Sequence, residues 1–361
     1  MTRPIIALLG RKDEPTDAVE EYCHYLGSAL KAHDFATQMR RVPWEKHGWA
    51  DALKALKLQA AGWRGTWVLV QYTALAWSER GFPQKFIRVL RILKKAGAKV
   101  AVVFHDVEPY PGSRLADKIR RSAQVRTLRA TLDAADAGIF TIALEQITWL
   151  SKSQRNVHFI PVGANLPIAE AASAGSTPTD IPAIAVFSIT GGKAGEREAR
   201  TIVDAVRHAA EKIGRLRLSV FGRHAELREN DLREGLCGVP VDISVEGVID
   251  PGQVVQRLRA CDVLLFVRGT ISTRRGSAIA GIACGLPVIA HPGSETAAPI
   301  TEAGVILVPA SDPEELRTAL VRVLSDRVYR EELAARSRAV YRAHLSWPAI
   351  AARFAEILKL E

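Results

Sequence analysis

Short apolar runs alternate with amphipathic stretches along the whole chain. The apolar runs are four to seven residues long and rich in Val, Ile, Ala and Leu, which is typical of parallel strands covered on both faces. The stretches between them have the spacing of helices with one buried face. The alternation predicts an α/β fold in which helices cross over between parallel strands.

The same alternation occurs in both halves of the chain. Strands are expected at residues 5–9, 36–42, 66–72, 99–104, 137–141 and 157–161, and again at 183–188, 216–221, 242–245, 262–267, 287–290 and 305–308. Helices of the first half are expected at residues 18–32, 50–61, 84–96 and 115–134.

The chain has 361 residues, which is long enough for two domains with separate cores. Residues 169–182 are polar, contain proline and show no periodicity, so they are the expected linker. We expect a Rossmann-like domain over residues 1–168, a second over 183–345, and a terminal helix over 346–361 that packs back on the first. Ligands of such folds bind beyond the carboxyl ends of the strands, so the site is expected in a cleft between the domains.

Composition excludes several classes of protein. Apolar residues make up 48% and charged residues 24% of the chain, which disfavours a disordered, fibrous or membrane-spanning protein. The apolar opening at residues 4–9 is too short for a signal peptide, so a cytoplasmic location is expected. The four cysteines are far apart and form no Cys-x-x-Cys, which indicates reduced thiols rather than disulfides or zinc.

The net charge of +10 belongs to the first half of the chain. Residues 1–165 hold 25 Lys and Arg against 15 Asp and Glu, whereas the remainder holds 24 of each. Such a field attracts a nucleic acid, an acidic membrane surface or a phosphorylated substrate; the alternative is a solvated basic surface that aids solubility. Five of these cations fall on one predicted helix: Lys118, Arg120, Arg121, Arg126 and Arg129.

Residues 262–290 hold the clearest candidate site. A strand leads through a polar loop into a helix of small residues that is expected to start near Gly276 and Ser277. Free N–H groups at a helix start attract anions, Ser277 is a suitable cap, and Gly276 lets a phosphate approach the backbone. Three arginines surround this start, and with it they suit a diphosphate: Arg268, Arg274 and Arg275. The alternative is an ordinary capped helix with solvated arginines.

The sequence here resembles the GT-B glycosyltransferases, most closely the retaining glycosyltransferase family four. The run ACGLPVIA at residues 283–290 is similar to that family, as are IPVGAN at 160–165, VFHD at 103–106 and GVILVP at 304–309. The resemblance implies two Rossmann-like domains facing across a cleft. It also implies transfer of a hexose from a nucleoside diphosphate sugar with retention of configuration.

One departure from the family concerns the donor site. The family usually has two glutamates, eight positions apart, that contact the donor sugar and the ribose; Ser272 and Ala280 stand at these positions. A hydroxyl of Ser272 or Thr273 can still bond a sugar or phosphate oxygen, but Ala280 cannot hold a ribose. Donor binding is therefore expected to be rearranged, or the domain is a non-catalytic one.

A second phosphate element is expected at residues 188–197, where a strand passes through a glycine-rich loop into a helix. Its glycines, Gly191, Gly192 and Gly195, let the backbone approach a ligand. By resemblance, Lys193 and Arg197 are the cations that neutralise the leaving diphosphate. Arg223, after the next strand, faces the same cleft or forms a surface salt bridge.

His105 ends a strand of the first domain. The resemblance implies that it contacts the donor sugar; the alternative is a histidine bonded to nearby backbone. Asp106 and Glu108 are the next candidates for an acid or base. No Gly-x-Gly-x-x-Gly follows the first strand, which counts against a nicotinamide-dependent dehydrogenase.

The combined interpretation is a cytoplasmic, peripheral-membrane hexosyltransferase that needs neither a metal nor a cofactor. Its partners are expected to be a nucleotide sugar, an acceptor glycan or lipid-linked sugar of polysaccharide biosynthesis, and an anionic membrane surface, with no nucleic acid. One alternative is a non-catalytic protein that binds nucleotide sugars or polyanions, and another is a sugar epimerase of GT-B type.

Overall fold

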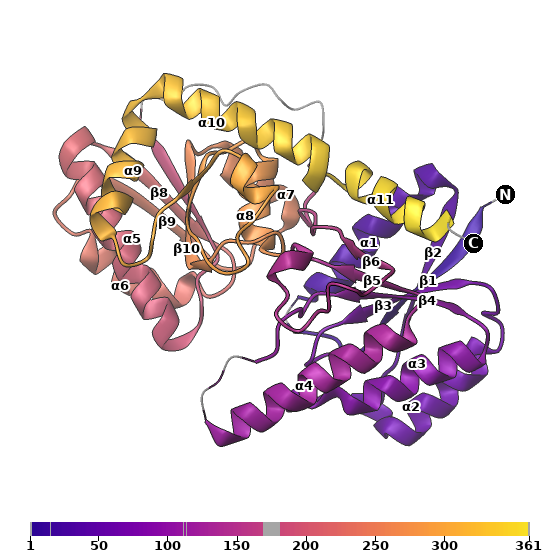
Figure 1. Ribbon diagram of the computed structural model, residues 1–361. Helices are drawn as coiled ribbons and strands as arrows, with labels where there is room; N and C mark the ends of the chain where they lie inside the picture. The colour runs from indigo at the N-terminus through magenta and orange to yellow at the C-terminus, as the bar shows by residue number, and fades with distance from the viewer. Residues whose placement is uncertain (1, 15, 111, 113, 169–180, 360–361) are drawn as a thin grey trace. The chain divides into compact units, whose positions relative to one another are not determined.

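The computed structural model of the chain describes residues 2–14, 16–110, 112, 114–168 and 181–359. The chain divides into two compact units (Figure 1): one comprises Met1–Val162 with Trp347–Glu361, and the other is Gly163–Ser346. The first unit therefore takes its residues from both ends of the chain. Of the expected linker at 169–182, positions 169–180 lie outside the described residues.

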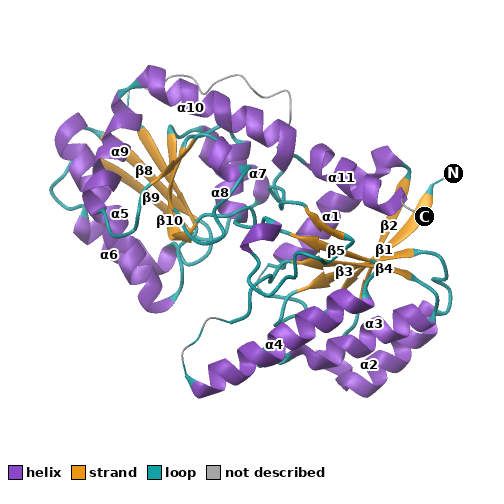
Figure 2. Cartoon of the chain, viewed as in Figure 1, coloured by secondary structure: helices purple, strands orange, loops and turns teal. Residues whose placement is uncertain are grey.

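The first unit is built on six parallel strands in the order β2-β1-β3-β4-β5-β6. All six strands expected in the first half are present. They are β1 (Arg3–Leu9), β2 (Phe35–Arg41), β3 (Trp67–Tyr72), β4 (Lys99–Phe104), β5 (Ala137–Phe140) and β6 (Val157–Phe159). The inner strands are buried on both faces, which explains their unbroken apolar runs. Figure 2 shows strands at the centre of each unit with helices outside.

Helices cover both faces of this sheet and differ in charge. On one face lie α2 (Trp44–Ala60), α3 (Phe86–Lys95) and α4 (Leu115–Ala134), which share a core with the sheet. On the other lie α1 (Ala18–Leu30) and α11 (Trp347–Lys359). Two glutamates and no Lys or Arg occur in α1, whereas α3 has four Lys and Arg and no acidic residue. Positive charge therefore gathers on the α2–α4 face.

Aromatic contacts join α11 to the start of the chain. Trp347 stacks on Tyr25 of α1 with ring centroids 5.7 Å apart and meets the edge of Tyr22 at 5.3 Å. At the far end of α11, the Trp67 indole N–H donates to the Leu358 carbonyl at 3.0 Å. The last helix is thus part of the first unit's packing.

The second unit repeats the architecture, with six parallel strands in the order β12-β11-β10-β7-β8-β9. The strands are β7 (Ala183–Phe187), β8 (Leu216–Phe221), β9 (Val241–Glu246), β10 (Val263–Thr270), β11 (Val288–His291) and β12 (Val305–Leu307). The helices are α5 (Gly192–Ile213), α6 (Glu229–Gly235), α7 (Pro251–Arg259), α8 (Gly276–Ala283), α9 (Pro313–Ser325) and α10 (Arg327–Val340). The predicted α/β class is confirmed in both units.

Candidate functional site: an arginine cluster at the sheet reversal

The strand order of the second unit reverses between β7 and β10, which are paired neighbours. Each leads through a short loop into a helix, β7 into α5 and β10 into α8. Within the described part of the chain, no side chain caps the first N–H groups of either helix. Ligands of open parallel sheets bind at such a reversal. Two uncapped helix N-termini beside it make this edge suitable for an anion.

The start of α8 differs from the prediction in one detail. Ser277 was expected to cap the helix, and this is wrong, because Arg275 occupies the cap position. The Arg275 N–H donates to the Ser272 carbonyl at 3.1 Å, and its own carbonyl accepts from Ala278 at 3.0 Å. Ser277 therefore lies within the first turn. A Cβ built at Gly276 meets no atom within 4 Å, so the space outside this turn is open.

The glycine-rich loop after β7 is held tightly against the start of α5. A Cβ at Gly195 would clash with the Thr190 carbonyl oxygen, so only glycine allows the helix to come this close. The Glu198 carboxylate reaches back to accept the Thr190 N–H at 2.7 Å. Gly191 is the cap residue of α5, and Gly192 follows with φ of 65° and open space at its Cβ position. The loop backbone is thus exposed where a ligand can reach it.

Lys193 and Arg197, the two cations expected in this loop, both lie on α5 and are exposed. They stand four residues apart and so share one face of the helix. Lys193 belongs to the first turn, while Arg197 lies in the second. Lys193 is therefore the nearer of the two to the uncapped N–H groups.

Arg268 lies on β10 between charges from two other elements. Burial lowers the pKa of Arg268, and the Arg223 guanidinium lowers that pKa further, whereas the Glu198 carboxylate raises it. The loops after β7 and β8 are also joined by backbone, since the Ile189 N–H donates to the Arg223 carbonyl at 3.0 Å. Arg223 thus belongs to the same edge as Arg268.

Arg275 extends this cluster toward α8. Burial lowers the pKa of Arg275, the neighbouring Arg274 and Arg268 lower it as well, and Glu295 raises it. Within the described residues its Nε is buried without a hydrogen-bond partner. Four arginines thus share one edge with two carboxylates, which leaves an excess of two positive charges. Crowded guanidinium groups that depress one another's pKa favour a bound anion.

Ser272 and Thr273 are deeply buried, with 0% and 1% of their surface exposed. The Ser272 hydroxyl faces Glu295, whose pKa is raised by burial but lowered by more through Arg274, Arg275 and Ser272, so that the net shift is downward. Ala280 is 1% exposed inside α8. The two side chains are therefore enclosed within the loop in this structure and do not reach its open side.

His105 stands in the first unit, directly after β4. Its Nε2 lies 2.9 Å from Oε1 of Gln71, a residue 2% exposed, and its ring meets the edge of Tyr22 at 4.9 Å. Of the two further acid or base candidates, Asp106 accepts the Ala74 N–H and Glu108 accepts the N–H and hydroxyl of Thr148. Those two carboxylates therefore serve loop structure.

Residues 186–326 match the family model described as Glycosyl transferases group 1. The matched range begins at the end of β7 and includes β10, both uncapped helices and the arginine cluster. This part of the chain is a glycosyl transferases group 1 domain. A curated relative, the GDP-mannose-dependent monoacylated alpha-(1-6)-phosphatidylinositol monomannoside mannosyltransferase of Corynebacterium glutamicum, is 28% identical over 139 residues. That match spans 37% of this chain and about a third of the relative, 36% of its length.

Solved structures resemble the whole chain in fold. A glycosyltransferase from Rickettsia africae superposes with a TM-score of 0.71 at 14% identity over 100% of both chains. Sucrose-phosphate synthase from Thermosynechococcus elongatus gives 0.66 at 20% identity over 98% of each. Anabaena HepE, in complex with UDP and glucose, gives 0.65 at 14% identity over 99% of each. The whole chain, including its glycosyl transferases group 1 domain, therefore has the two-domain fold of GT-B glycosyltransferases.

Two carboxylates of this domain were missed by sequence reasoning, Glu198 and Glu295. Glu198 accepts the N–H of Thr190, eight positions earlier, and raises the pKa of Arg268. Glu295 pairs with Arg274 in another loop. Glu198 carries a weak local signal, because an acidic residue near a helix start commonly accepts a backbone N–H. Glu295 carries none, since it lies 21 positions after Arg274 in an irregular loop.

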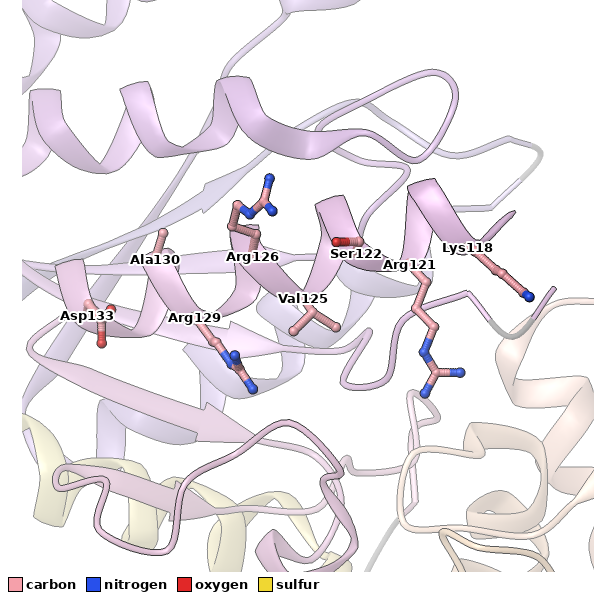
Figure 3. Close-up of a pocket in the computed structure, with 8 residues that line it drawn as sticks. All are labelled: Lys118, Arg121, Ser122, Val125, Arg126, Arg129, Ala130 and Asp133. Carbon is pink, nitrogen blue, oxygen red and sulfur yellow. The ribbon is translucent and has the colours of Figure 1, made fainter. Parts of the chain in front are cut away.

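Three further features bear on cofactors and partners. Within the described ranges, no three or more His, Cys, Asp or Glu gather as metal ligands. No described helix combines the length and apolar character needed to cross a bilayer. Along α4 runs a hollow of about 660 Å³, lined by residues of that helix between Lys118 and Asp133 (Figure 3).

Proposed function

We propose that the chain is a hexosyltransferase that uses a nucleoside diphosphate sugar as its donor. The arginine cluster at the sheet reversal carries this proposal, because its excess of two positive charges suits a diphosphate. The glycosyl transferases group 1 domain contains the cluster. HepE, similar in fold, was crystallised with UDP-glucose, and the curated relative is named for GDP-mannose.

In this reaction the bond between the sugar C1 and the diphosphate oxygen breaks, and a bond forms between C1 and an acceptor hydroxyl oxygen. The hydroxyl proton is released, and negative charge develops on the leaving diphosphate. Arg268 and Arg275 would stabilise that charge together with the N–H groups at the starts of α5 and α8. Lys193 would add a cation from the first turn of α5 and Arg197 one from the second. Because fixed cations and helix dipoles supply the stabilisation, we propose a metal-independent reaction. Retention of configuration is proposed on the family resemblance.

The first unit would hold the acceptor, and His105 would contact the donor sugar from there. The α2–α4 face of this unit is basic, which suits an acceptor that carries phosphate, such as a lipid-linked sugar of polysaccharide biosynthesis. An anionic membrane surface on the cytoplasmic side attracts the same face. We therefore propose a peripheral enzyme of that surface rather than a nucleic-acid-binding protein.

Ligand-dependent stabilisation is the first test of this proposal. UDP, GDP, TDP and ADP are each added to the purified chain, and unfolding temperatures are compared with that of the free protein. A nucleotide at 100 times its dissociation constant should stabilise the fold by about 2.7 kcal/mol. The corresponding nucleotide sugar should then be hydrolysed slowly without an acceptor. No response to any nucleoside diphosphate would contradict the proposal.

A second candidate function is a non-catalytic domain that binds nucleotide sugars. Ala280 favours it, because a buried methyl group stands where the family carries a ribose-binding glutamate. This candidate predicts stabilisation by a nucleoside diphosphate but no hydrolysis and no transfer with any nucleotide sugar. Donor hydrolysis that is lost on Lys193→Ala would contradict it.

A further inference from the structure

The outward side of α4 carries four cations and two large apolar side chains. We call these six residues, Leu115, Lys118, Ile119, Arg121, Arg126 and Arg129, the α4 face. All four cations are exposed, and none forms an ion pair with a carboxylate of the described residues. Figure 3 shows Lys118, Arg121 and Arg129 pointing away from the helix beside the hollow, and Arg126 leaving it in a different direction. The helix thus presents positive charge along most of its length.

The fifth cation of the helix, Arg120, does not belong to this face. Its guanidinium lies 3.5 Å from the Asp117 carboxylate. It also lies over the rings of Tyr110 and Phe82, with centroids 4.9 and 5.7 Å away. Of the five cations that the sequence places on this helix, Arg120 is therefore the exception, because it is turned toward the buried side that holds Gln124.

The apolar members of the α4 face gather at its first turns. Leu115 is 75% exposed and Ile119 is 59% exposed, and the ring of Tyr110, just before the helix, is 48% exposed. Leu115 and Ile119 are four residues apart, so they lie next to each other on the same side of the helix. Such a surface can bind a partner through two contributions, the electrostatic attraction of its cations and the burial of its hydrocarbon side chains.

We propose that the α4 face docks on the surface of an anionic phospholipid bilayer. Charge complementarity argues for this occupant, because the four cations meet lipid phosphates while Leu115 and Ile119 enter the boundary of the acyl chains. A nucleic acid would satisfy the cations but would offer no hydrocarbon to cover the two apolar side chains. The role of this docking rests on the proposed function: it would bring the enzyme to a lipid-linked acceptor.

Co-sedimentation with vesicles tests the docking without donor or turnover. The protein should bind vesicles of phosphatidylcholine mixed with phosphatidylglycerol, bind vesicles of phosphatidylcholine weakly, and lose binding as salt rises. Lys118→Ala with Arg121→Ala should lower the partition coefficient roughly 30-fold, because each cation near the surface contributes about a fivefold gain. Leu115→Gln with Ile119→Gln should weaken the binding that survives at high salt.

Arg200→Ala with Lys212→Ala is the matched control, since it removes two exposed cations from another long helix, α5. It should reduce binding much less than the α4 pair. Calorimetry with UDP or GDP should give the same affinity for the α4 variants as for the wild type, which separates docking from donor binding. The proposal would be overturned if both pairs of substitutions reduced vesicle binding equally, or if the protein bound neutral and anionic vesicles equally well. Tighter binding to RNA than to vesicles, unaffected by the Leu115 and Ile119 substitutions, would also overturn it.

Discussion

Arg274 and Glu295 form a two-point ion pair, with Nε–Oε2 and Nη2–Oε1 distances of 2.7 Å. The two residues follow neighbouring strands, Arg274 after β10 and Glu295 after β11. Glu295 is 14% exposed and Arg274 is 26% exposed. A planar guanidinium held at two points fixes the orientation of its own backbone. The pair thereby holds the turn that places Arg275 at the start of α8.

Glu295→Gln should lower the free energy of unfolding by about 1–3 kcal/mol at neutral pH, because it leaves Arg274 without its charged partner. The pKa of Glu295 is lowered in the folded state. Its stabilisation is therefore full above the pKa of an unfolded glutamate and is lost as pH falls through the folded-state pKa. Urea unfolding in neutral and acidic buffers should show the difference between variant and wild type shrinking in acid.

Asp242→Asn is the control for this change, because Asp242 pairs with Arg215 at an exposed site, with 53% and 63% of the two side chains exposed. Its effect should stay below about 1 kcal/mol. A loss in Glu295→Gln that is the same at every pH would mean that packing, and not the ion pair, accounts for the effect.

Arg275→Ala should weaken the binding of a nucleoside diphosphate by about 1.5–3 kcal/mol, since a charge-assisted hydrogen bond to the diphosphate is removed. Titration calorimetry with the nucleotide that stabilises the wild type measures this directly. Arg336→Ala on α10, an exposed arginine outside this edge, should leave the affinity unchanged. Unchanged affinity in Arg275→Ala would place the diphosphate elsewhere.

The sequence was sufficient to predict the layers of both units. Strands such as β4 and β10 are buried on both faces and therefore appear as unbroken apolar runs, which periodicity identifies. The start of α8 and its arginines were also predicted, because the helix start and the charges are adjacent in sequence. The strands and the start of α8 each depend on one continuous segment, so local sequence patterns are sufficient to predict them.

The contacts across the sheet edge were not predictable in the same way. Glu295 reaches Arg274 only because β10 and β11 are neighbours, and no local pattern indicates which loop faces which. Ser277 was misplaced as a cap because the turn after β10 continues to Arg275. The orientation of Arg120 could have been predicted from helical spacing. Gln124 and Leu128, four and eight positions later, lie on the same side of the helix, and that side is buried.

Gln71 should act as a positioning residue for His105. The Gln71 Nε2 donates to the Leu69 carbonyl at 3.3 Å, which directs the Gln71 Oε1 toward Nε2 of the His105 ring. Because an amide oxygen only accepts, this contact favours a proton on that ring nitrogen. Gln71→Leu, similar in volume, should lower kcat with little change in nucleotide affinity. His105→Ala should abolish donor hydrolysis while calorimetry still detects the nucleotide. Equal kcat in Gln71→Leu and wild type would mean that the ring is held by other contacts.

Removal of divalent metal should leave activity in place. If the arginine cluster and the helix N-termini carry the charge of the diphosphate, EDTA should not reduce the rate of donor hydrolysis. The control is the same assay with added magnesium or manganese, which should raise the rate little. Strict dependence on either ion would contradict the metal-independent reaction.

Gly276→Ala should separate stability from ligand binding. A Cβ at this position meets no atom within 4 Å, and alanine favours a helix over glycine by about 1 kcal/mol, so the free energy of unfolding should rise slightly. The same methyl group would stand beside the uncapped N–H groups and keep a phosphate at a distance, so nucleotide affinity should fall roughly tenfold. Gly195→Ala is the contrasting variant. Its Cβ would clash with the Thr190 carbonyl, so this substitution should destabilise the fold.

Urea unfolding measures the stability of both variants, and calorimetry measures their nucleotide affinity. Unchanged affinity in Gly276→Ala would show that the diphosphate does not approach the start of α8.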